Sequence, residues 1–265
     1  MFTFDQDLAL ALELADAADQ ISLPRFRALD LSIETKPDLS PVTDADKSVE
    51  QKITSLLAQV RPEDAIVGEE FGSTGDSGRK WIIDPIDGTT NFVRGVPVWA
   101  TLIALSIDGK PTVSVVSAPA LGARWWAAPG TGAHTQSFNQ AARKISVSKV
   151  SKLGDSSISY NNLQLWQKSD LLPALLKLSE KVWRTRAYGD FWSYMLLAEG
   201  SVDVVAEHDL KIYDIAALVP IIEQAGGMIS DISGELTEAS SSILATNKIL
   251  HTQVSEFLAS SGIGG

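Results

Sequence analysis

Apolar residues near the start of the chain recur at the spacing of a helix. They stand at Leu10, Leu14, Ala17 and Ile21. Because residues about one turn apart share a helix face, this pattern predicts an amphipathic helix over residues 5–23. Pro24 follows, and a proline there is typical of a helix end.

A second helix is expected to begin at Thr43. Thr43 and Asp46 resemble a capping box, in which a hydroxyl and an acid satisfy the first free N–H groups of a helix. Asp46 therefore lies in the first turn, where the helix dipole favours its ionised form. The apolar positions of this helix predict one buried stripe, at Val49, Ile53, Leu56 and Val60.

The rest of the first half alternates in the manner of strands. Strands are predicted near 29–33, 64–68 and 81–83, over 99–107 and 112–117, and at 124–128 and 144–147. Asp108-Gly109 indicates a hairpin turn, and the Gly- and Ser-rich residues 72–78 indicate a surface loop. Two helices beside an antiparallel sheet make this half α+β.

After about residue 150 the pattern changes to strands that alternate with helices. Strands are predicted at 157–160, 182–184, 202–206, 228–230 and 243–245, and helices at 168–180, 190–199, 213–225 and 248–260. Such alternation is typical of α/β folds. We therefore expect an α/β protein with an α+β domain over residues 1–148 and an α/β domain over residues 149–265.

Composition and charge narrow the possible functions. The net charge of −11 argues against nucleic acid or an anionic membrane surface as a partner. The absence of cysteine excludes disulfides, thiolate metal sites and cysteine-based phosphatase chemistry. No signal peptide is recognisable at the N-terminus, and no apolar run reaches the roughly 18 residues of a membrane span. We expect a soluble, cytoplasmic protein.

The stretch from Trp81 to Phe92 carries the strongest chemical signal. An apolar strand leads into a loop that holds Asp84 and Asp87. Pro85 disfavours the α region for the residue before it, so Asp84 is expected at the end of the strand. Acids at this place suggest a cation site.

An anion site is expected immediately after these acids. Gly88 permits a sharp reversal, and Thr89 or Thr90 can then cap a helix whose free N–H groups face an anion. A divalent cation between the acids and a phosphate explains both features together. The alternative is that Asp-Pro and Asp-Gly are ordinary turn residues.

Two further acids stand at the end of a strand and at the start of a helix, Glu69 and Asp214. Alone, an acid such as Asp214 is more often a helix cap. Two carboxylates about 4 Å apart repel by about 4 kcal/mol at an effective dielectric near 20, so acids that share a cleft need cations. Oxygen ligands favour Mg²⁺ or Mn²⁺ over zinc.

Three motifs in order resemble the inositol monophosphatase family. They are Gly68-Glu69-Glu70, Asp84-Pro85-Ile86-Asp87-Gly88-Thr89-Thr90-Asn91-Phe92, and Tyr213-Asp214-x-Ala216-Ala217 with Glu223-x-Ala225-Gly226-Gly227. Tyr213 departs from the tryptophan of many members. The resemblance implies a layered αβαβα sandwich, a homodimer, and Mg²⁺-dependent, lithium-sensitive hydrolysis of a small-molecule phosphate ester.

The resemblance also implies a role for each motif residue. Two Mg²⁺ ions, with a weaker third beside Glu69 or with Mn²⁺ as a substitute, would be held by Glu69, Asp84, the carbonyl of Ile86, Asp87 and Asp214. A water on the first ion, oriented by Thr89 with Asp46 behind it, would attack the phosphorus, so Glu69, Thr89 and Asp46 are the candidate catalytic residues. The N–H groups of Gly88 and Thr89 would bind phosphate, without a covalent intermediate. Lys36 would close over the site, unless it is a solvated lysine.

In this family the second half holds the leaving group. Gly189-Asp190 with Tyr194 resembles the branch that hydrolyses histidinol phosphate, and Glu207 stands seven positions before Asp214. Two carboxylates, Asp190 and Glu207, would suit a cationic alcohol. The full set of candidate substrate residues is Arg186, Gly189, Asp190, Trp192, Tyr194 and Glu207.

Several alternatives remain open from the sequence. Asp190 could merely cap the helix at 190–199, and the substrate could be inositol phosphate or another polyol phosphate. Asp44-Ala45-Asp46 could be read as the site of an aspartyl-phosphate phosphatase, but these acids follow no buried strand. A Mg²⁺-binding protein without activity is a further alternative, although all four acidic ligand positions are present.

Overall fold

The chain divides into two compact units. A computed structural model describes residues 2–137 and 140–261. The first unit comprises the chain up to Lys144 together with Tyr213–Ile221, and the second comprises Ile145–Ile212 and the chain from Ile222 onward. The cut between residues 148 and 149 stays a prediction, but Asp214 belongs to the first unit. The expected fold class, α+β followed by α/β, is confirmed.

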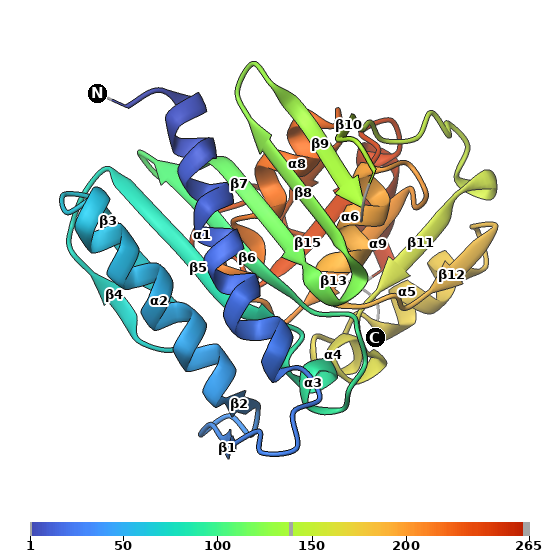
Figure 1. The fold of residues 1–265 in the computed structure, drawn as a ribbon. Coiled ribbons are helices and arrows are strands. Elements are labelled where there is room, and N and C mark those ends of the chain that lie inside the picture. The colour runs from blue at the N-terminus through green and yellow to red at the C-terminus, as the bar shows by residue number, and fades with distance from the viewer. Residues whose placement is uncertain (1, 138–139, 262–265) are drawn as a thin grey trace. The chain divides into compact units, whose positions relative to one another are not determined.

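Within the described residues, the first unit contains an eight-stranded sheet in the order β10-β9-β8-β7-β6-β5-β3-β4 (Figure 1). Its strands are β3 (Ala65–Gly68), β4 (Gly72–Thr74), β5 (Arg79–Asp87), β6 (Ala100–Ile107), β7 (Lys110–Ala118), β8 (Ala123–Ala128), β9 (Gly132–Ser137) and β10 (Arg143–Lys144). β3 runs parallel to β5, and the other neighbouring pairs are antiparallel. A separate hairpin pairs β1 (Ile33–Thr35) with β2 (Pro41–Thr43).

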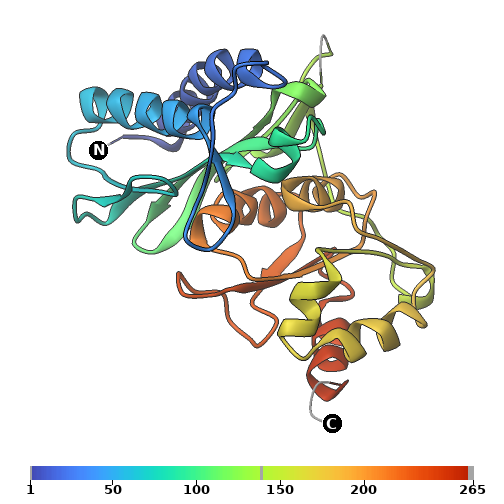
Figure 2. The same cartoon turned by 90° about the horizontal axis from the view of Figure 1, so that it is seen from below.

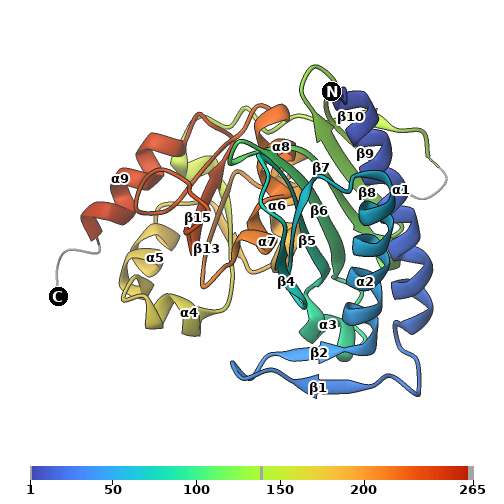
Figure 3. The ribbon, with the colours of Figure 1, turned by 90° about the vertical axis from the view of Figure 1, so that its left-hand side faces the viewer.

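Two helices, α1 (Phe4–Arg25) and α2 (Asp44–Val60), cover one face of this sheet. Figure 1 and Figure 3 show them side by side, and they contact β5, β6 and β7. Their apolar side chains form one core with Trp81, Ile83 and Ile103 of the sheet. The predicted first helix is confirmed, although Pro24 lies inside it and the helix ends at Arg25.

Helix α2 begins as predicted, and its buried stripe differs from the predicted one at its last turn. Thr43 and Asp46 form the expected capping box. Val49 and Ile53 are fully buried, but Leu57 continues the stripe and Val60 is 45% exposed. Leu56 is partly buried and packs against the same core, as predicted. The prediction of Val60 was wrong, because the stripe continues in steps of four residues and ends with Leu57.

The edges of the first sheet were the hardest elements to predict. Residues 72–78 were expected to form a loop, but β4 occupies part of them. β9 has no apolar run, so its sequence gives no strand signal. The strand expected over 144–147 is limited to β10, which overlaps it only at Lys144.

Within the described residues, the second unit contains a five-stranded sheet in the order β12-β11-β13-β15-β14. Its strands are β11 (Ser157–Tyr160), β12 (Arg184–Arg186), β13 (Val204–His208), β14 (Met228–Ser230) and β15 (Ser242–Thr246). Strands β12, β11 and β13 are parallel, and β15 is antiparallel to both of its neighbours.

Helices α4 (Leu163–Lys168), α5 (Leu172–Ser179) and α9 (His251–Ser261) pack on one face of this sheet (Figure 2). Helix α6 (Asp190–Ala198) contacts β13 and β15. The helix expected over 168–180 begins only at Leu172, as α5, because Asp170 before it adopts a left-handed φ of 60°, and α4 was not predicted. The helix expected over 213–225 is divided into α7 (Ile212–Ile215) and α8 (Leu218–Gln224). Among the described helices, none is both long and apolar enough to cross a membrane.

A pair of substitutions tests the buried stripe of α2. Leu57→Ala is expected to lower the free energy of unfolding by about 2–5 kcal/mol, because it leaves a cavity in the core. Val60→Ala is expected to change it by no more than about 0.5 kcal/mol, as is usual at the surface. Equal losses for the two variants in chemical denaturation would contradict the assignment.

Candidate active site

The end of β5 carries two of the candidate metal ligands. The pairing of β5 with β6 is irregular between Asp84 and Asp87, as in a β-bulge. Asp84 is buried, and its Oδ1 accepts a hydrogen bond from the N–H of Ile86 at 3.0 Å. The hydroxyl of Thr101 donates to the carbonyl of Pro85 at 2.8 Å. The strand end is therefore held in an irregular but well-bonded conformation.

Three acids meet at this place. One carboxylate oxygen from each of Asp84, Asp87 and Asp214 lies within 4.8 Å of the other two. Asp214 comes from α7, and it lies in the segment Tyr213–Ile221, which belongs to the first unit although it is far along the chain. Asp84 is buried, and the other two are half-buried. The structure thus brings together three of the acids that stand out in the sequence by their places at the ends of strands and the starts of helices.

The electrostatics of this cluster favour a bound cation. Burial raises the pKa of Asp84 well above its ordinary value, and the charges of Glu69, Asp87 and Asp214 raise it further. Burial also raises the pKa of the Tyr213 phenol, with Glu69 and Asp214 adding to the effect. A divalent cation would relieve this repulsion, and carboxylate oxygens are the ligands that Mg²⁺ and Mn²⁺ prefer. The residues present therefore fit the expected metal.

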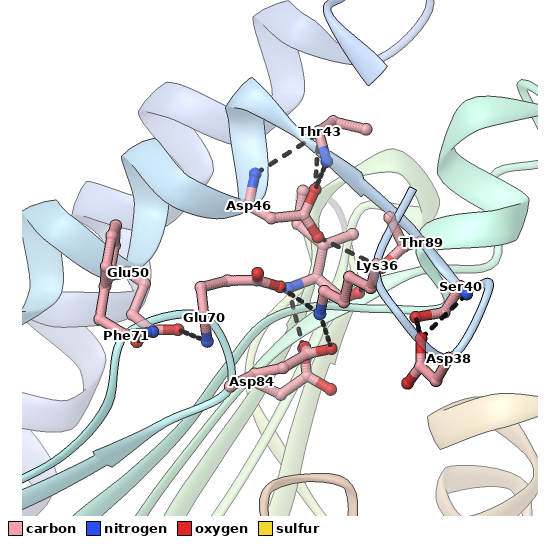
Figure 4. A network of polar contacts seen from close by, with 12 residues as sticks. Lys36, Asp38, Ser40, Thr43, Asp46, Glu50, Glu70, Phe71, Asp84 and Thr89 are labelled. Carbon is pink, nitrogen blue, oxygen red and sulfur yellow. Dashed lines mark hydrogen bonds and ion pairs between the residues drawn. The ribbon is translucent and has the colours of Figure 1, made fainter. Parts of the chain in front are cut away.

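Lys36 reaches the acids from the β1–β2 hairpin. Its Nζ lies 2.7 Å from Oε1 of Glu69 and 2.7 Å from Oε1 of Glu70 (Figure 4). Burial alone would lower the pKa of Lys36, but the hydrogen bonds to Glu69 and Glu70 outweigh it and the pKa is raised. Burial raises the pKa of Glu70 to about 7. With only 19% of its side chain exposed, Lys36 is not a solvated lysine.

Asp46 and Thr89 lie together, as the resemblance implies. Oδ2 of Asp46 accepts hydrogen bonds from the N–H and hydroxyl of Thr43 at 2.8 and 2.5 Å. Its Oδ1 lies 3.2 Å from the hydroxyl of Thr89, which is also 2.9 Å from the carbonyl of Ile86. Burial raises the pKa of Asp46, although the Thr43 hydrogen bonds oppose the shift. The capping box of α2 therefore also orients Asp46 toward Thr89.

Gly88, not a threonine, is the N-cap of helix α3 (Thr89–Val93). It has a left-handed φ of 83°, which glycine adopts without strain. The prediction that Thr89 or Thr90 caps this helix was wrong, because the reversal at Gly88 already starts it. The Thr89 hydroxyl is then free to turn back toward Asp46 and Ile86.

Glu50 is a buried acid of this region that the sequence analysis missed. Its two carboxylate oxygens accept hydrogen bonds from the N–H groups of Glu70 at 2.8 Å and Phe71 at 2.9 Å (Figure 4). Burial raises its pKa. The available signal was an acid one turn after Asp46, on the apolar face of a helix, where a solvated acid is not expected.

In the second unit, Tyr194 and Glu207 are hydrogen-bonded partners. The hydroxyl of Tyr194, on α6, donates to Oε2 of Glu207, on β13, at 3.0 Å, and both residues are buried. Asp190 is the first residue of α6 and has a positive φ of 49°. Burial raises its pKa to about 6.

The remaining candidate substrate residues lie around the start of α6 and at the end of β12. Gly189 donates its N–H to the hydroxyl of Ser193 at 3.0 Å. The Trp192 ring meets that of Tyr188 edge-on, with centroids 5.8 Å apart. Arg186 ends β12, is exposed, and donates to the carbonyl of Thr185 at 2.7 Å.

Known proteins resemble this chain over nearly its whole length. A model of the inositol monophosphatase family matches residues 4–261. The histidinol-phosphatase of Mycobacterium tuberculosis is 52% identical over 249 residues, which cover 94% of this chain and 96% of that protein. The histidinol-phosphatase of Streptomyces coelicolor is 50% identical over 256 residues, with coverages of 95% and 96%. A solved inositol monophosphatase from Zymomonas mobilis has a TM-score of 0.84 at 34% identity and covers 99% of this chain and 100% of its own.

Replacing one acid tests the repulsion within the cluster. Asp84→Asn is expected to stabilise the metal-free protein, because burial and the neighbouring acids disfavour a charged carboxylate at this position. The amide removes a repelled charge and keeps an oxygen for the N–H of Ile86. Added Mg²⁺ is expected to raise the unfolding temperature of the wild type and not that of the variant.

The stability difference between Asp84→Asn and the wild type is also expected to depend on pH, in a direction that follows from the raised pKa. Because the folded-state pKa of Asp84 lies above its ordinary 3.8, its contribution to stability is complete below that value and is lost as pH rises through the raised pKa. In the presence of a chelator, the stability advantage of Asp84→Asn over the wild type should therefore grow as the pH rises above about 4. Glu63→Gln, which replaces an exposed carboxylate, serves as the control. A stability difference between Asp84→Asn and the wild type that does not change with pH would contradict the repulsion at Asp84.

Proposed function

Because the chain belongs to the inositol monophosphatase family, we propose that it is a Mg²⁺-dependent phosphatase that hydrolyses L-histidinol phosphate to L-histidinol and phosphate. The observation that carries this proposal is the identity of 50% and 52% to two proteins named histidinol-phosphatase, over nearly the whole chain. Identity to the solved inositol monophosphatase is only 34%. The product alcohol places the reaction in histidine biosynthesis.

The metal-holding residues would be Glu69, Asp84, the carbonyl of Ile86, Asp87 and Asp214. We propose two Mg²⁺ ions, with a weaker third beside Glu69 and with Mn²⁺ as a substitute. When bound, such ions supply the positive charge that phosphoryl transfer needs and lower the pKa of a coordinated water. The mutual repulsion at Asp84 supports this proposal, because it gives the cluster a reason to take up cations.

Thr89 and Asp46 would orient the attacking water. The Thr89 hydroxyl carries one proton, which it donates to Oδ1 of Asp46 or to the carbonyl of Ile86. Its oxygen can then accept a hydrogen bond from a water and direct that water's lone pair toward phosphorus. Thr43 holds the opposite oxygen of Asp46, so Asp46 keeps one orientation. Direct attack by water leaves no covalent phosphoenzyme.

The phosphate would lie at the start of α3. The N–H groups of Gly88 and Thr89 stand at the beginning of this short helix, where such groups bind anions. We assign Lys36 to the same end of the site, because its ammonium already contacts two of the acids and can also attract a phosphate oxygen.

The leaving group would be recognised by residues of the second unit. Histidinol carries an ammonium and an imidazole, which two carboxylates, Asp190 and Glu207, suit better than they suit a neutral polyol. Tyr194 holds Oε2 of Glu207 in place. Gly189, Trp192 and Arg186 complete the proposed substrate set.

Inositol or another polyol phosphate is the second candidate substrate. The fold of the Zymomonas mobilis inositol monophosphatase, with a TM-score of 0.84, favours it. The homodimer and the cytoplasmic location that the resemblance implies are also proposals.

A phosphate-release assay separates the two substrates. With Mg²⁺, kcat/KM for histidinol phosphate is expected to exceed that for inositol 1-phosphate and for fructose 1,6-bisphosphate by at least about tenfold, about 1.4 kcal/mol. Chelation should abolish release, and Mg²⁺ should restore it. A preference for inositol 1-phosphate would contradict histidinol phosphate as the substrate, and the proposal that the protein is a phosphatase would stand.

Two variants that replace a carboxylate with an uncharged amide test the acids of the second unit. Asp190→Asn and Glu207→Gln are expected to raise KM for histidinol phosphate by about tenfold or more, and to change that for glycerol 2-phosphate little. Asp209→Asn, an exposed acid at the end of β13 that pairs with Lys168, is the matched control. If KM rises equally for both esters, the hypothesis that these carboxylates bind a cationic leaving group is wrong.

A further inference from the structure

The turn that presents Glu69 is fastened at one side by a buried carboxylate. Glu69, Glu70 and Phe71 connect β3 to β4. At the start of the turn, the N–H of Glu69 donates to the carbonyl of Ile83 at 3.2 Å, which continues the pairing of β3 with β5. In the rest of the turn, the N–H groups of Glu70 and Phe71 both donate to Glu50. Glu50 therefore fixes the half of the turn that the sheet does not.

Gly68 shows how closely Glu50 approaches this turn. A Cβ atom on Gly68 would lie 1.8 Å from Oε1 of Glu50, far inside any real contact distance. The glycine is therefore required by the position of the carboxylate, and its φ plays no part. Glu50 is 1% exposed, so it cannot move into solvent without disturbing the packing of α2.

Glu50 and Asp46 lie one turn apart on the same face of α2. Asp46 contacts Thr89, which follows β5, and Glu50 contacts the turn that follows β3. In Figure 4 both acids extend from this helix toward the polar network. One rigid helix thus sets the positions of two segments that carry candidate catalytic groups.

We propose that Glu50 is a positioning residue that holds the Glu69 turn in the conformation needed to bind a divalent cation. The inference rests on the proposed function, since Glu69 is a metal ligand only in that proposal. Glu50 itself contacts backbone N–H groups and donates no ligand atom. Residues that orient ligands in this way typically change metal affinity by about 10–100-fold when they are replaced.

Metal binding without substrate is the direct test. In Glu50→Gln one carboxylate oxygen becomes an NH₂ group that faces an N–H group, so one of the two turn hydrogen bonds is lost. We expect the Kd for Mn²⁺, measured by electron paramagnetic resonance on the metal-free protein, to rise by about tenfold. Activity should largely return at saturating Mg²⁺, so the loss is in affinity and not in kcat.

Asp7→Asn is the matched control. Asp7 is also a fully buried carboxylate of the first unit, but it pairs with Arg79 at the start of β5, the end of the strand opposite to Asp84. Its replacement is expected to lower the unfolding temperature and leave the Mn²⁺ affinity unchanged. Equal weakening of Mn²⁺ binding in both variants would overturn the inference, because general destabilisation would then explain it.

Gly68→Ala tests the same contact from the other side, and it decides the matter if Glu50→Gln does not fold. Its methyl group must displace the Glu50 carboxylate, so a similar loss of Mn²⁺ affinity is expected. Wild-type Mn²⁺ affinity in a folded Glu50 or Gly68 variant overturns the positioning role and leaves the proposed function standing. A wild-type protein that binds no Mn²⁺ overturns both.

Discussion

Repulsion between carboxylates is the constraint on which the first unit depends. Asp84 is buried beside other acids, and burial together with their charges raises its pKa. A chain free to relax would separate such groups, so rigid elements must hold them. The irregular end of β5, the turn after β3 and helix α7 each fix one acid or two. Affinity for a cation and local instability without one then have the same cause.

The same hydrogen bonds serve the helix and the site. In α2 the capping box satisfies the first N–H groups and also leaves one oxygen of Asp46 directed at Thr89. One turn later Glu50 satisfies two N–H groups of a neighbouring turn. Buried acids in a helix are costly unless they are bonded in this way. Their presence on the buried face of α2 is explained by the segments that they hold.

Features that depend on neighbouring residues were predicted from the sequence, whereas contacts between distant segments were harder to predict. The Thr43–Asp46 capping box and the strand before Asp84 follow from neighbouring residues, and both were predicted. The meeting of Asp214 with Asp84 depends on how α7 joins the first unit, which no spacing reveals. The positions of these acids in the sequence suggested a shared cation site, and the family resemblance made that prediction specific. Glu50 was missed because most acids in helices are solvated. β9 was missed because a strand without an apolar run gives no periodic signal.

Strand alternation in β13 has a consequence for how substrate preference can diverge. Ala206 packs in the apolar core with α4, α5 and α9, whereas its neighbour Glu207 faces Tyr194 of α6. Adjacent residues of a strand point to opposite faces, so Glu207 lies outside the core to which Ala206 belongs. If Glu207 binds the leaving group as proposed, a substitution at this position also removes the hydrogen bond from the buried Tyr194 hydroxyl. Substrate preference on this scaffold would then diverge through paired changes at positions 194 and 207, with the core on the other face of the sheet left intact.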